Sequence, residues 1–251
     1  MIRAMVVRPR IVVTLHGPEQ ASLEEPTWAT FDNYLEAVRR AGGAPVPLDP
    51  ESTPDERAAA FAAMDGLLLP GGADLDPASY GEARHPSVHV HVDARRDDLE
   101  LAAWDAARRR RIPIFGVCRG FQAINVFSGG TLLQHLDGHD YSPDTPEAHA
   151  LHLEPTSRLA RILGETEPLL RAEVNSYHHQ AVRPADLAPG LVASGMSPHH
   201  DGDLVEALEA ADGRFVFGIQ CHPERTESTA PAFERLFAVF VDAARGPAGR
   251  R

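Results

Sequence analysis

The segment GVCRGFQ, residues 116–122, places Cys118 at a predicted corner between two elements. The apolar run at 112–117 is typical of a strand buried on both faces. A helix-like run follows directly, so we expect the thiol at the N-terminal end of a helix, where the helix dipole lowers a thiol pKa and favours the nucleophilic thiolate. Gly116 and Gly120 flank the cysteine and supply the small residues that such a corner needs. Without its neighbours, this pattern fits a buried structural cysteine equally well.

The segment GIQCHPE, residues 218–224, offers a base and an acid that could orient it. His222 and Glu224 lie two residues apart at the end of a predicted strand, so their side chains are expected on the same side. A cysteine nucleophile usually needs a base, and the base needs an orienting acid. Together with Cys118, the pair predicts acyl transfer through a thioester.

Acyl transfer also needs hydrogen-bond donors for the developing oxyanion. The glycine-bearing turn PGG, residues 70–72, follows an apolar run that predicts a buried strand, and its backbone amides could supply one donor. The amide of Arg119, directly after the nucleophile, could supply the second. Considered without these neighbours, PGG reads as a plain turn.

The composition excludes several kinds of chemistry. The 251 residues carry a formal net charge of −12, which disfavours nucleic acid or an anionic membrane as the main partner and favours a small molecule. All 24 basic residues are arginine, so Schiff-base, P-loop and serine-lysine chemistry are excluded. The sequence shows neither a signal peptide nor an apolar stretch of membrane-spanning length, and we expect a cytoplasmic protein with two free thiols, Cys118 and Cys221.

The chain contains 13 histidines, some of them in the segments 85–91 and 135–139. His89 and His91 alternate on a strand-like run and share a face, but no acidic or cysteine ligand is obviously placed to complete a site. We therefore expect solvated loop histidines, with no metal and no organic cofactor.

Hydrophobic patterns predict an α/β protein with a single domain over residues 1–251. Strands alternate with helices in the first two thirds, as in a parallel sheet with crossover helices, and 137–150 reads as a polar excursion or lid. The predicted strands are 11–15, 44–48 (near an edge because of its prolines), 66–72 (ending in a tight turn), 112–117, 149–155, 172–182, 191–196, 204–210 and 215–224. The predicted helices are 27–43, 55–64, 93–111, the run after Cys118, and 230–245.

Four motifs carry a resemblance to a known family. PGGADLDPASYGE, GVCRGFQAINVFSGGTLLQHL, VNSYHHQAV and GIQCHPE, in this order, resemble the class I glutamine amidotransferase-like superfamily and, within it, the gamma-glutamyl-gamma-aminobutyrate hydrolases of putrescine breakdown. The resemblance implies a flavodoxin-like three-layer α/β sandwich with a mostly parallel central sheet. It also implies a catalytic triad of Cys118, His222 and Glu224, and an oxyanion hole formed by the amides of Gly72 and Arg119.

The resemblance further implies residues that bind the glutamyl half of a small gamma-glutamyl substrate: Gln122, Asn175, Ser176 and His178. One position departs from the pattern, since many relatives have tryptophan where this chain has Cys221. The identity of the leaving amine stays open. Acidic residues such as Asp74, Asp76 and Asp140 could suit a cationic leaving group, although loop acids are commonly just solvated.

Two other functions remain as alternatives. The first is a glutaminase subunit that delivers ammonia to a separate synthetase, since the same superfamily fold serves both activities. The second is a non-catalytic binding protein on this fold, which the presence of all three triad positions disfavours. The oligomeric state is also open, with a homodimer compatible with a cytoplasmic enzyme of this size.

Overall fold

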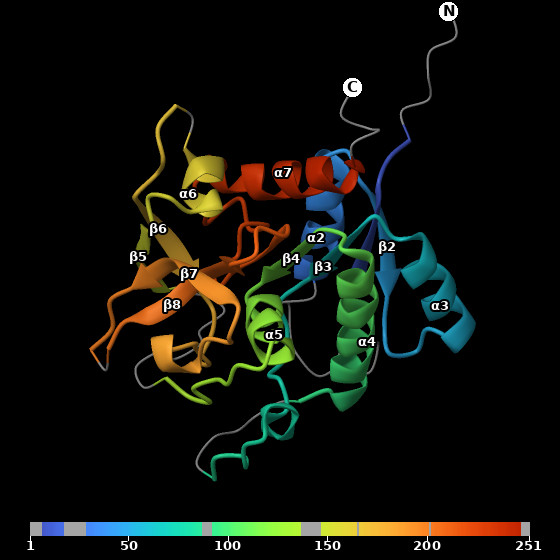
Figure 1. The fold of residues 1–251 in the computed structure, drawn as a ribbon, viewed down its shortest axis with the longest axis horizontal. Helices are drawn as coiled ribbons and strands as arrows, with labels where there is room; N and C mark the ends of the chain where they lie inside the picture. Colours follow the sequence, from blue (N-terminus) through green and yellow to red (C-terminus); the bar gives the residue numbers. More distant parts are fainter. Residues whose placement is uncertain are drawn as a thin grey trace, which may run out of the picture.

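The computed structural model describes residues 7–17, 29–86, 92–136, 147–164, 166–200 and 202–246. Nine strands form one sheet in the order β2-β1-β3-β4-β9-β8-β7-β5-β6 (Figure 1). The strands are β1 (Arg10–Thr14), β2 (Ala44–Leu48), β3 (Gly66–Leu69), β4 (Ile114–Val117), β5 (Glu147–Leu153), β6 (Arg171–Ser176), β7 (Leu191–Ser197), β8 (Leu204–Ala210) and β9 (Val216–Ile219).

The sheet has a parallel part and an antiparallel part. The pairs from β2 through β1, β3 and β4 to β9 are all parallel, and β2 lies at the edge, as its prolines predict. From β9 onward β8, β7, β5 and β6 pair antiparallel. Residues 177–182 were predicted to continue the strand that became β6, but they leave it and form only isolated bridges to neighbouring segments.

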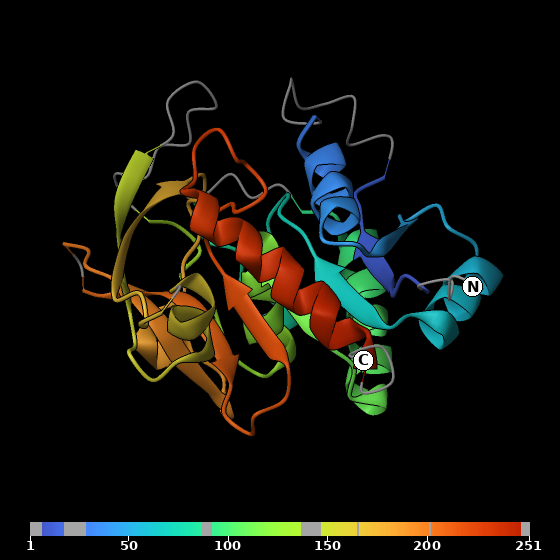
Figure 2. The same cartoon turned by 90° about the horizontal axis from the view of Figure 1, so that it is seen from above.

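Helices cover both faces of the sheet and complete three layers. One face carries α2 (Ala29–Arg40), α6 (Arg158–Leu163) and α7 (Glu234–Ala244), and the other carries α3 (Pro54–Ala63), α4 (Ala94–Arg110) and α5 (Arg119–Phe127). Figure 1 shows α6 and α7 above the sheet and α4 and α5 below it, and Figure 2 shows α7 lying across the strands. The expected α/β sandwich is therefore confirmed, with the antiparallel strands β5 to β8 as an extension of its parallel part.

Strand alternation divides the core between the two faces. Along β1, Ile11 and Val13 pack with α2 and α7, whereas Val12 packs with α3 and α4. The strands β3 and β4 are buried at every position, as expected for central parallel strands covered on both faces.

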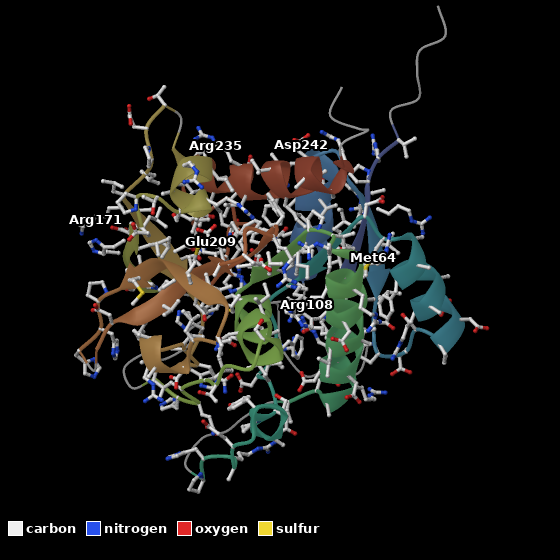
Figure 3. The ribbon with its side chains drawn as sticks, viewed as in Figure 1. Met64, Arg108, Arg171, Glu209, Arg235 and Asp242 are labelled. Carbon is white, nitrogen blue, oxygen red and sulfur yellow. The ribbon has the colours of Figure 1, made fainter. Side chains whose placement is uncertain are left out.

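The short helix α6 was not predicted, and two contacts fix it. Its first amide, that of Arg158, donates to the carboxylate of Glu209 on β8 at 3.0 Å, and Arg235 on α7 donates to its last carbonyl, that of Leu163, at 2.9 Å (Figure 3). Both partners lie far from α6 in sequence, so no local pattern indicates them.

The predicted lid and the predicted histidine-rich segment lie partly outside the residues that the structure describes. Of the predicted lid 137–150, residues 147–150 belong to β5, and 137–146 lie outside the described residues, as do His89, His91 and Asp140. Within the described ranges no helix has the length and apolar composition needed to span a membrane.

Candidate active site

Cys118 occupies a sharp turn between β4 and α5, at the carboxyl end of the parallel strands. Its backbone has φ 51° and ψ −107°, a conformation that costs a non-glycine residue about 1–3 kcal/mol. A Cβ on Gly116 would lie 2.4 Å from the Gly120 carbonyl oxygen, and a Cβ on Gly120 would lie 1.9 Å from the Leu69 carbonyl oxygen. The two glycines that flank the cysteine are therefore required by close backbone contacts, as the sequence predicted.

The thiol is 6% exposed and sits directly before the first turn of α5, at the positive end of the dipole of this helix. The Cys118 amide donates to the Ile219 carbonyl at 2.8 Å, which extends the ladder between β4 and β9. The Gln220 side-chain nitrogen lies 3.5 Å from the sulfur and donates to it. Strand pairing thus fixes the position of the nucleophile relative to the segment that follows β9.

His222 Nδ1 donates to Glu224 Oε1 at 2.6 Å, and both side chains are buried. The predicted contact between the two residues is confirmed, but the expected reason was wrong. The strand β9 ends at Ile219, so the pair lies in the turn beyond it, and strand alternation does not bring the side chains together. Burial alone would lower the pKa of His222, but the Glu224 carboxylate and the Cys118 thiolate outweigh it and raise this pKa to about 10.

Asn175, predicted to bind the glutamyl group, makes hydrogen bonds to the backbone of His222. Its Oδ1 accepts from the His222 amide at 2.8 Å, and its Nδ2 donates to the His222 carbonyl at 3.3 Å and to Ser228 Oγ at 2.8 Å. The Tyr177 ring packs edge-on against the imidazole, with ring centroids 5.3 Å apart. These contacts fix the main chain and the ring of His222 from β6 and the segment after it.

Tyr34 on α2 reaches the same site and was missed by the sequence analysis. Its hydroxyl accepts from the Gly71 amide at 3.1 Å and lies 3.3 Å from His222 Nδ1, and the side chain is 1% exposed. A Cβ on Gly71 would lie 2.9 Å from this hydroxyl, 3.0 Å from His222 Cε1 and 3.6 Å from Cys118 Cβ. Cys118, His222 and Tyr34 therefore surround one point of the loop after β3.

The loop after β3 also carries the proposed oxyanion donor Gly72. This residue is exposed, and its φ of +145° lies in a region that favours glycine. A Cβ there would lie 2.0 Å from Arg96 Nη1. Since the Gly71 amide is already bonded to Tyr34, the Gly72 amide is the donor of the glycine pair that remains for an oxyanion.

A buried charge network joins this loop to the residue after the nucleophile. Arg119 pairs with Glu100 and Asp97, and Arg96 Nε donates to Glu100 Oε1 at 2.9 Å. Arg96 Nη2 also donates to the Gly71 carbonyl at 2.8 Å. Burial alone would raise the pKa of Glu100, but the guanidinium groups of Arg119 and Arg96 outweigh it and lower this pKa. The network therefore holds the two segments whose amides are the proposed oxyanion donors.

The remaining predicted glutamyl-binding residues lie near the site but have internal contacts. Gln122 Nε2 donates to the Gln180 carbonyl and to Gln220 Oε1, both at 3.1 Å. Ser176 is buried at the end of β6. His178 Nδ1 donates to the Gln180 carbonyl at 2.9 Å, and the other edge of this ring faces Glu206.

Asp74 and Asp76, the described acidic residues that could suit a cationic leaving group, have hydrogen-bond partners nearby. His179 Nε2 lies 3.0 Å from Asp74 Oδ1, and this hydrogen bond raises the pKa of His179. Asp76 caps a short 3₁₀ helix, Pro77–Tyr80, by accepting from the Ala78 amide at 3.1 Å.

Cys221 is a free thiol, as is Cys118, in agreement with the sequence analysis. Burial, followed by the charges of Glu206 and Glu224, raises the pKa of Cys221 well above its ordinary value. Cys221 therefore puts a small, 1% exposed side chain next to His222, at the position where the sequence departs from the expected motif.

Comparisons with known proteins show which family the chain is similar to. The family model for peptidase C26 matches residues 11–224. The chain is 38% identical over 87% of its length to the putative glutamine amidotransferase Rv2859c of Mycobacterium tuberculosis, covering 68% of that protein. It is 33% identical over 84% of its length to the gamma-glutamyl-gamma-aminobutyrate hydrolase PuuD of Escherichia coli, covering 85% of that protein.

Solved structures support the fold. The glutaminase domain of Trypanosoma brucei CTPS superposes with a TM-score of 0.61 at 20% identity, covering 94% of this chain and 93% of that chain. With a family model that spans most of the chain and relatives above 30% identity, this protein belongs to the peptidase C26 family of class I glutamine amidotransferase-like proteins.

Proposed function

We propose that this protein is a cysteine hydrolase that cleaves gamma-glutamyl amide bonds through a thioester on Cys118. One observation carries the proposal: the thiol at the start of α5 and the imidazole of the buried His222–Glu224 pair flank the same point of the loop at Gly71. A nucleophile at a helix N-terminus, next to a base that an acid orients, is the arrangement that acyl transfer requires.

In the proposed mechanism the Cys118 thiolate attacks the gamma-carbonyl carbon, and the carbonyl electron pair moves to oxygen. The resulting oxyanion is stabilised by the amides of Gly72 and Arg119. His222, protonated in the resting pair, gives its proton to the leaving nitrogen as the carbon–nitrogen bond breaks, which leaves the thioester. His222 then takes a proton from water, the hydroxide attacks the thioester, and glutamate and the thiolate are released.

The resting state follows from the raised pKa of His222. An imidazolium stabilised by Glu224 holds a proton beside the nucleophile before substrate binds. The acid that protonates the leaving amine is then in place at the start of the reaction.

The substrate that we propose is gamma-glutamyl-gamma-aminobutyrate or a related gamma-glutamyl compound. The support is the 33% identity to a hydrolase of that name, together with the motifs PGGADLDP and NSYHHQAV. With this substrate the reaction would belong to putrescine breakdown in the cytoplasm.

A second candidate is a glutaminase that passes ammonia to a separate synthetase. The 38% identity to a protein named as a glutamine amidotransferase favours it, and the same three side chains would carry out the reaction. The two candidates differ only in the leaving group and in the need for a partner protein.

The test is glutamate release by the purified protein from gamma-glutamyl-gamma-aminobutyrate and, in parallel, from L-glutamine, with Cys118→Ala as the blank. The hydrolase proposal predicts fast turnover of the first substrate and slow turnover of the second, with no partner added. Turnover of glutamine alone would overturn it in favour of the glutaminase.

A further inference from the structure

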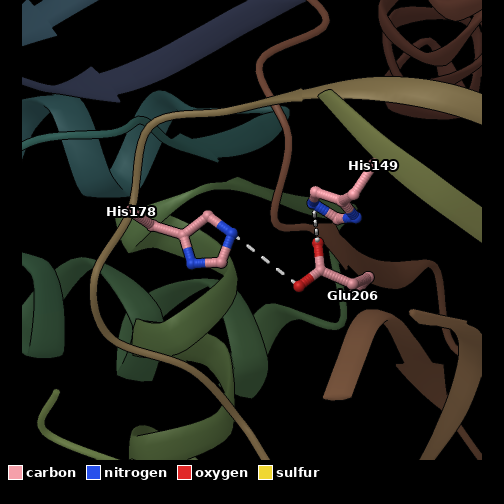
Figure 4. A group of neighbouring side chains, drawn as sticks. All are labelled: His149, His178 and Glu206. Atoms are coloured by element: carbon pink, nitrogen blue, oxygen red, sulfur yellow. Dashed lines mark ion pairs between the residues drawn. The ribbon is translucent and has the colours of Figure 1, made fainter. Parts of the chain in front are cut away.

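Three side chains from three separate segments converge beside the site, in the antiparallel part of the sheet (Figure 4). His149 comes from β5, His178 from the segment after β6, and Glu206 from β8. His149 Nε2 lies 3.7 Å from Glu206 Oε2, and His178 Nε2 lies 3.8 Å from Glu206 Oε1. Each residue offers one ligand atom, and these three atoms all lie within 4.8 Å of one another.

The separations of these atoms are too long for hydrogen bonds but suit ligands of one ion. When nitrogen and oxygen ligands lie at about 2.0–2.2 Å from a tetrahedral Zn²⁺, neighbouring ligand atoms are about 3.4 Å apart. The two nitrogens lie 3.7 and 3.8 Å from different oxygens of Glu206, and one ligand atom from each residue lies within 4.8 Å of the other two, so a pair of ligand atoms has to approach by at most about 1.4 Å to match this value.

The carboxylate of Glu206 is the second, independent observation. Its side chain is 2% exposed, and within the described part of the chain neither oxygen has a hydrogen-bond donor. Buried carboxylates are normally hydrogen-bonded, paired or bound to a metal. Both Glu206 oxygens instead point at imidazole nitrogens (Figure 4).

The opposite nitrogen of each imidazole is held by a protein group. His178 Nδ1 lies 2.9 Å from the Gln180 carbonyl, which can only accept, so Nδ1 carries the proton and the lone pair of Nε2 faces Glu206. His149 Nδ1 lies 2.8 Å from Ser197 Oγ. Histidines that bind metals usually have such a partner on the other ring nitrogen, because it fixes the tautomer and the ring orientation.

We propose that His149, His178 and Glu206 form a binding site for a divalent transition metal ion, Zn²⁺ in the first instance. Two imidazole nitrogens and one carboxylate oxygen are a donor set that Zn²⁺ accepts, and three protein ligands leave a fourth position for water or another ligand. The site departs from the expected absence of a metal and gives His178 a role other than contact with the glutamyl group.

The ion would fix the position of the segment after β6, which carries His178 and Gln180 and lies beside the active site. His178 precedes Gln180, whose carbonyl accepts from Gln122 on α5 at 3.1 Å. On the other side, the Gln220 amide donates to the Glu206 carbonyl at 2.8 Å, and the Gln220 side chain reaches the sulfur of Cys118. Metal binding would therefore connect β5, β8 and the segment after β6. Gln220 alone separates this metal site from the nucleophile, because it contacts both Glu206 and Cys118. The site does not depend on the proposed reaction.

The test is calorimetric titration of the chelator-treated, full-length protein with ZnCl₂, with bound zinc per chain measured by mass spectrometry after dialysis. All proteins carry Cys118→Ala, so that the catalytic thiol cannot contribute a ligand. The ligand variants are Glu206→Gln, which keeps the size of the side chain, and His149→Gln. The matched control is His152→Gln, an exposed histidine on the same strand β5.

We expect one zinc ion per chain and an affinity that falls at least about a hundredfold in both ligand variants, since loss of an outer partner alone costs about 10–100-fold. The control should bind like the parent. Thermal unfolding without zinc checks that each variant folds, and added zinc should raise the Tm of the parent and the control alone. Absence of zinc binding by the parent, or equal binding by parent and ligand variants, would overturn the proposal. If zinc does not bind and Glu206→Gln with Cys118 intact raises KM for gamma-glutamyl-gamma-aminobutyrate, the cluster is part of the substrate pocket instead, which also overturns it.

Discussion

Replacing Tyr34 by phenylalanine removes one hydroxyl from the centre of the candidate site. This hydroxyl is buried, accepts from the Gly71 amide at 3.1 Å and lies 3.3 Å from His222 Nδ1. In Tyr34→Phe the Gly71 amide remains buried without its acceptor, which costs about 1–3 kcal/mol. We therefore expect the free energy of unfolding to fall by an amount in this range.

The same substitution should slow the reaction, because Gly71 precedes the proposed oxyanion donor Gly72. If the substitution raises the activation free energy by about 1.4 kcal/mol, kcat falls about tenfold. The Gly72 amide is proposed to donate to the substrate oxyanion, which forms only in the transition state. KM should therefore change little. A residue that only stabilised the fold would lower the free energy of unfolding without this selective loss of kcat.

The assay pairs urea unfolding with steady-state hydrolysis of gamma-glutamyl-gamma-aminobutyrate. The matched control is Tyr80→Phe, since the Tyr80 hydroxyl has no hydrogen-bond partner among the described residues. The control should change the free energy of unfolding by less than about 0.5 kcal/mol and leave kcat unchanged. If Tyr34→Phe behaves like Tyr80→Phe in both measurements, the reasoning about the Gly71 loop is refuted.

Three further predictions concern the thiols, the buried ion pair and the nucleophile turn. A thiol reagent at neutral pH should modify Cys118 at least about tenfold faster than Cys221, because burial raises the pKa of Cys221, which is 1% exposed, whereas Cys118 is 6% exposed and lies at the start of α5; peptide mass mapping measures both rates. His222, with a pKa raised from 6.5 to about 10, contributes stability that is fully present below about pH 6.5 and is lost as pH rises through about 10; urea unfolding across this range should show a steeper decline in the native protein than in Glu224→Gln. Gly120→Ala should lower the free energy of unfolding by about 3 kcal/mol or more, because the new Cβ would lie 1.9 Å from a backbone carbonyl oxygen.

Each of these predictions has its own control. Denatured protein should lose the difference between the two thiols, and a persistent difference would point to the sequence around each cysteine instead. Parallel pH curves for the native protein and Glu224→Gln would contradict the raised pKa of His222. Gly17→Ala, whose Cβ would meet no atom of the described residues closer than 3.7 Å, should leave the free energy of unfolding nearly unchanged, and an equal loss in both glycine variants would contradict the packing account.

Features that depend on neighbours in sequence could be predicted. The apolar run before Cys118 and the glycines on either side of it indicate a buried strand and a tight turn, and the structure has both. The contact between His222 and Glu224 was also predicted, but from strand alternation, whereas the structure forms it in the turn after β9. The role of each residue in the reaction remains a proposal.

Features that depend on distant packing could not be predicted. The spacing of Arg96 and Glu100 is that of any solvent-exposed ion pair on a helix, and only the position of α4 against β1 and β3 shows that both are buried. Asn175 lies in a motif that suggested substrate contact, but the turn after β9 brings the His222 backbone within reach of its amide. Tyr34 reaches the site only because α2 packs beside the carboxyl ends of the parallel strands.

The central claim is that Cys118 is the nucleophile, and the most direct test compares hydrolysis by Cys118→Ala and by Cys221→Ala on one gamma-glutamyl substrate that the native protein turns over. Both substitutions remove one buried thiol from neighbouring positions of the same site. We predict that Cys118→Ala abolishes turnover and that Cys221→Ala retains most of it. Native-like turnover by a folded Cys118→Ala protein would contradict the account.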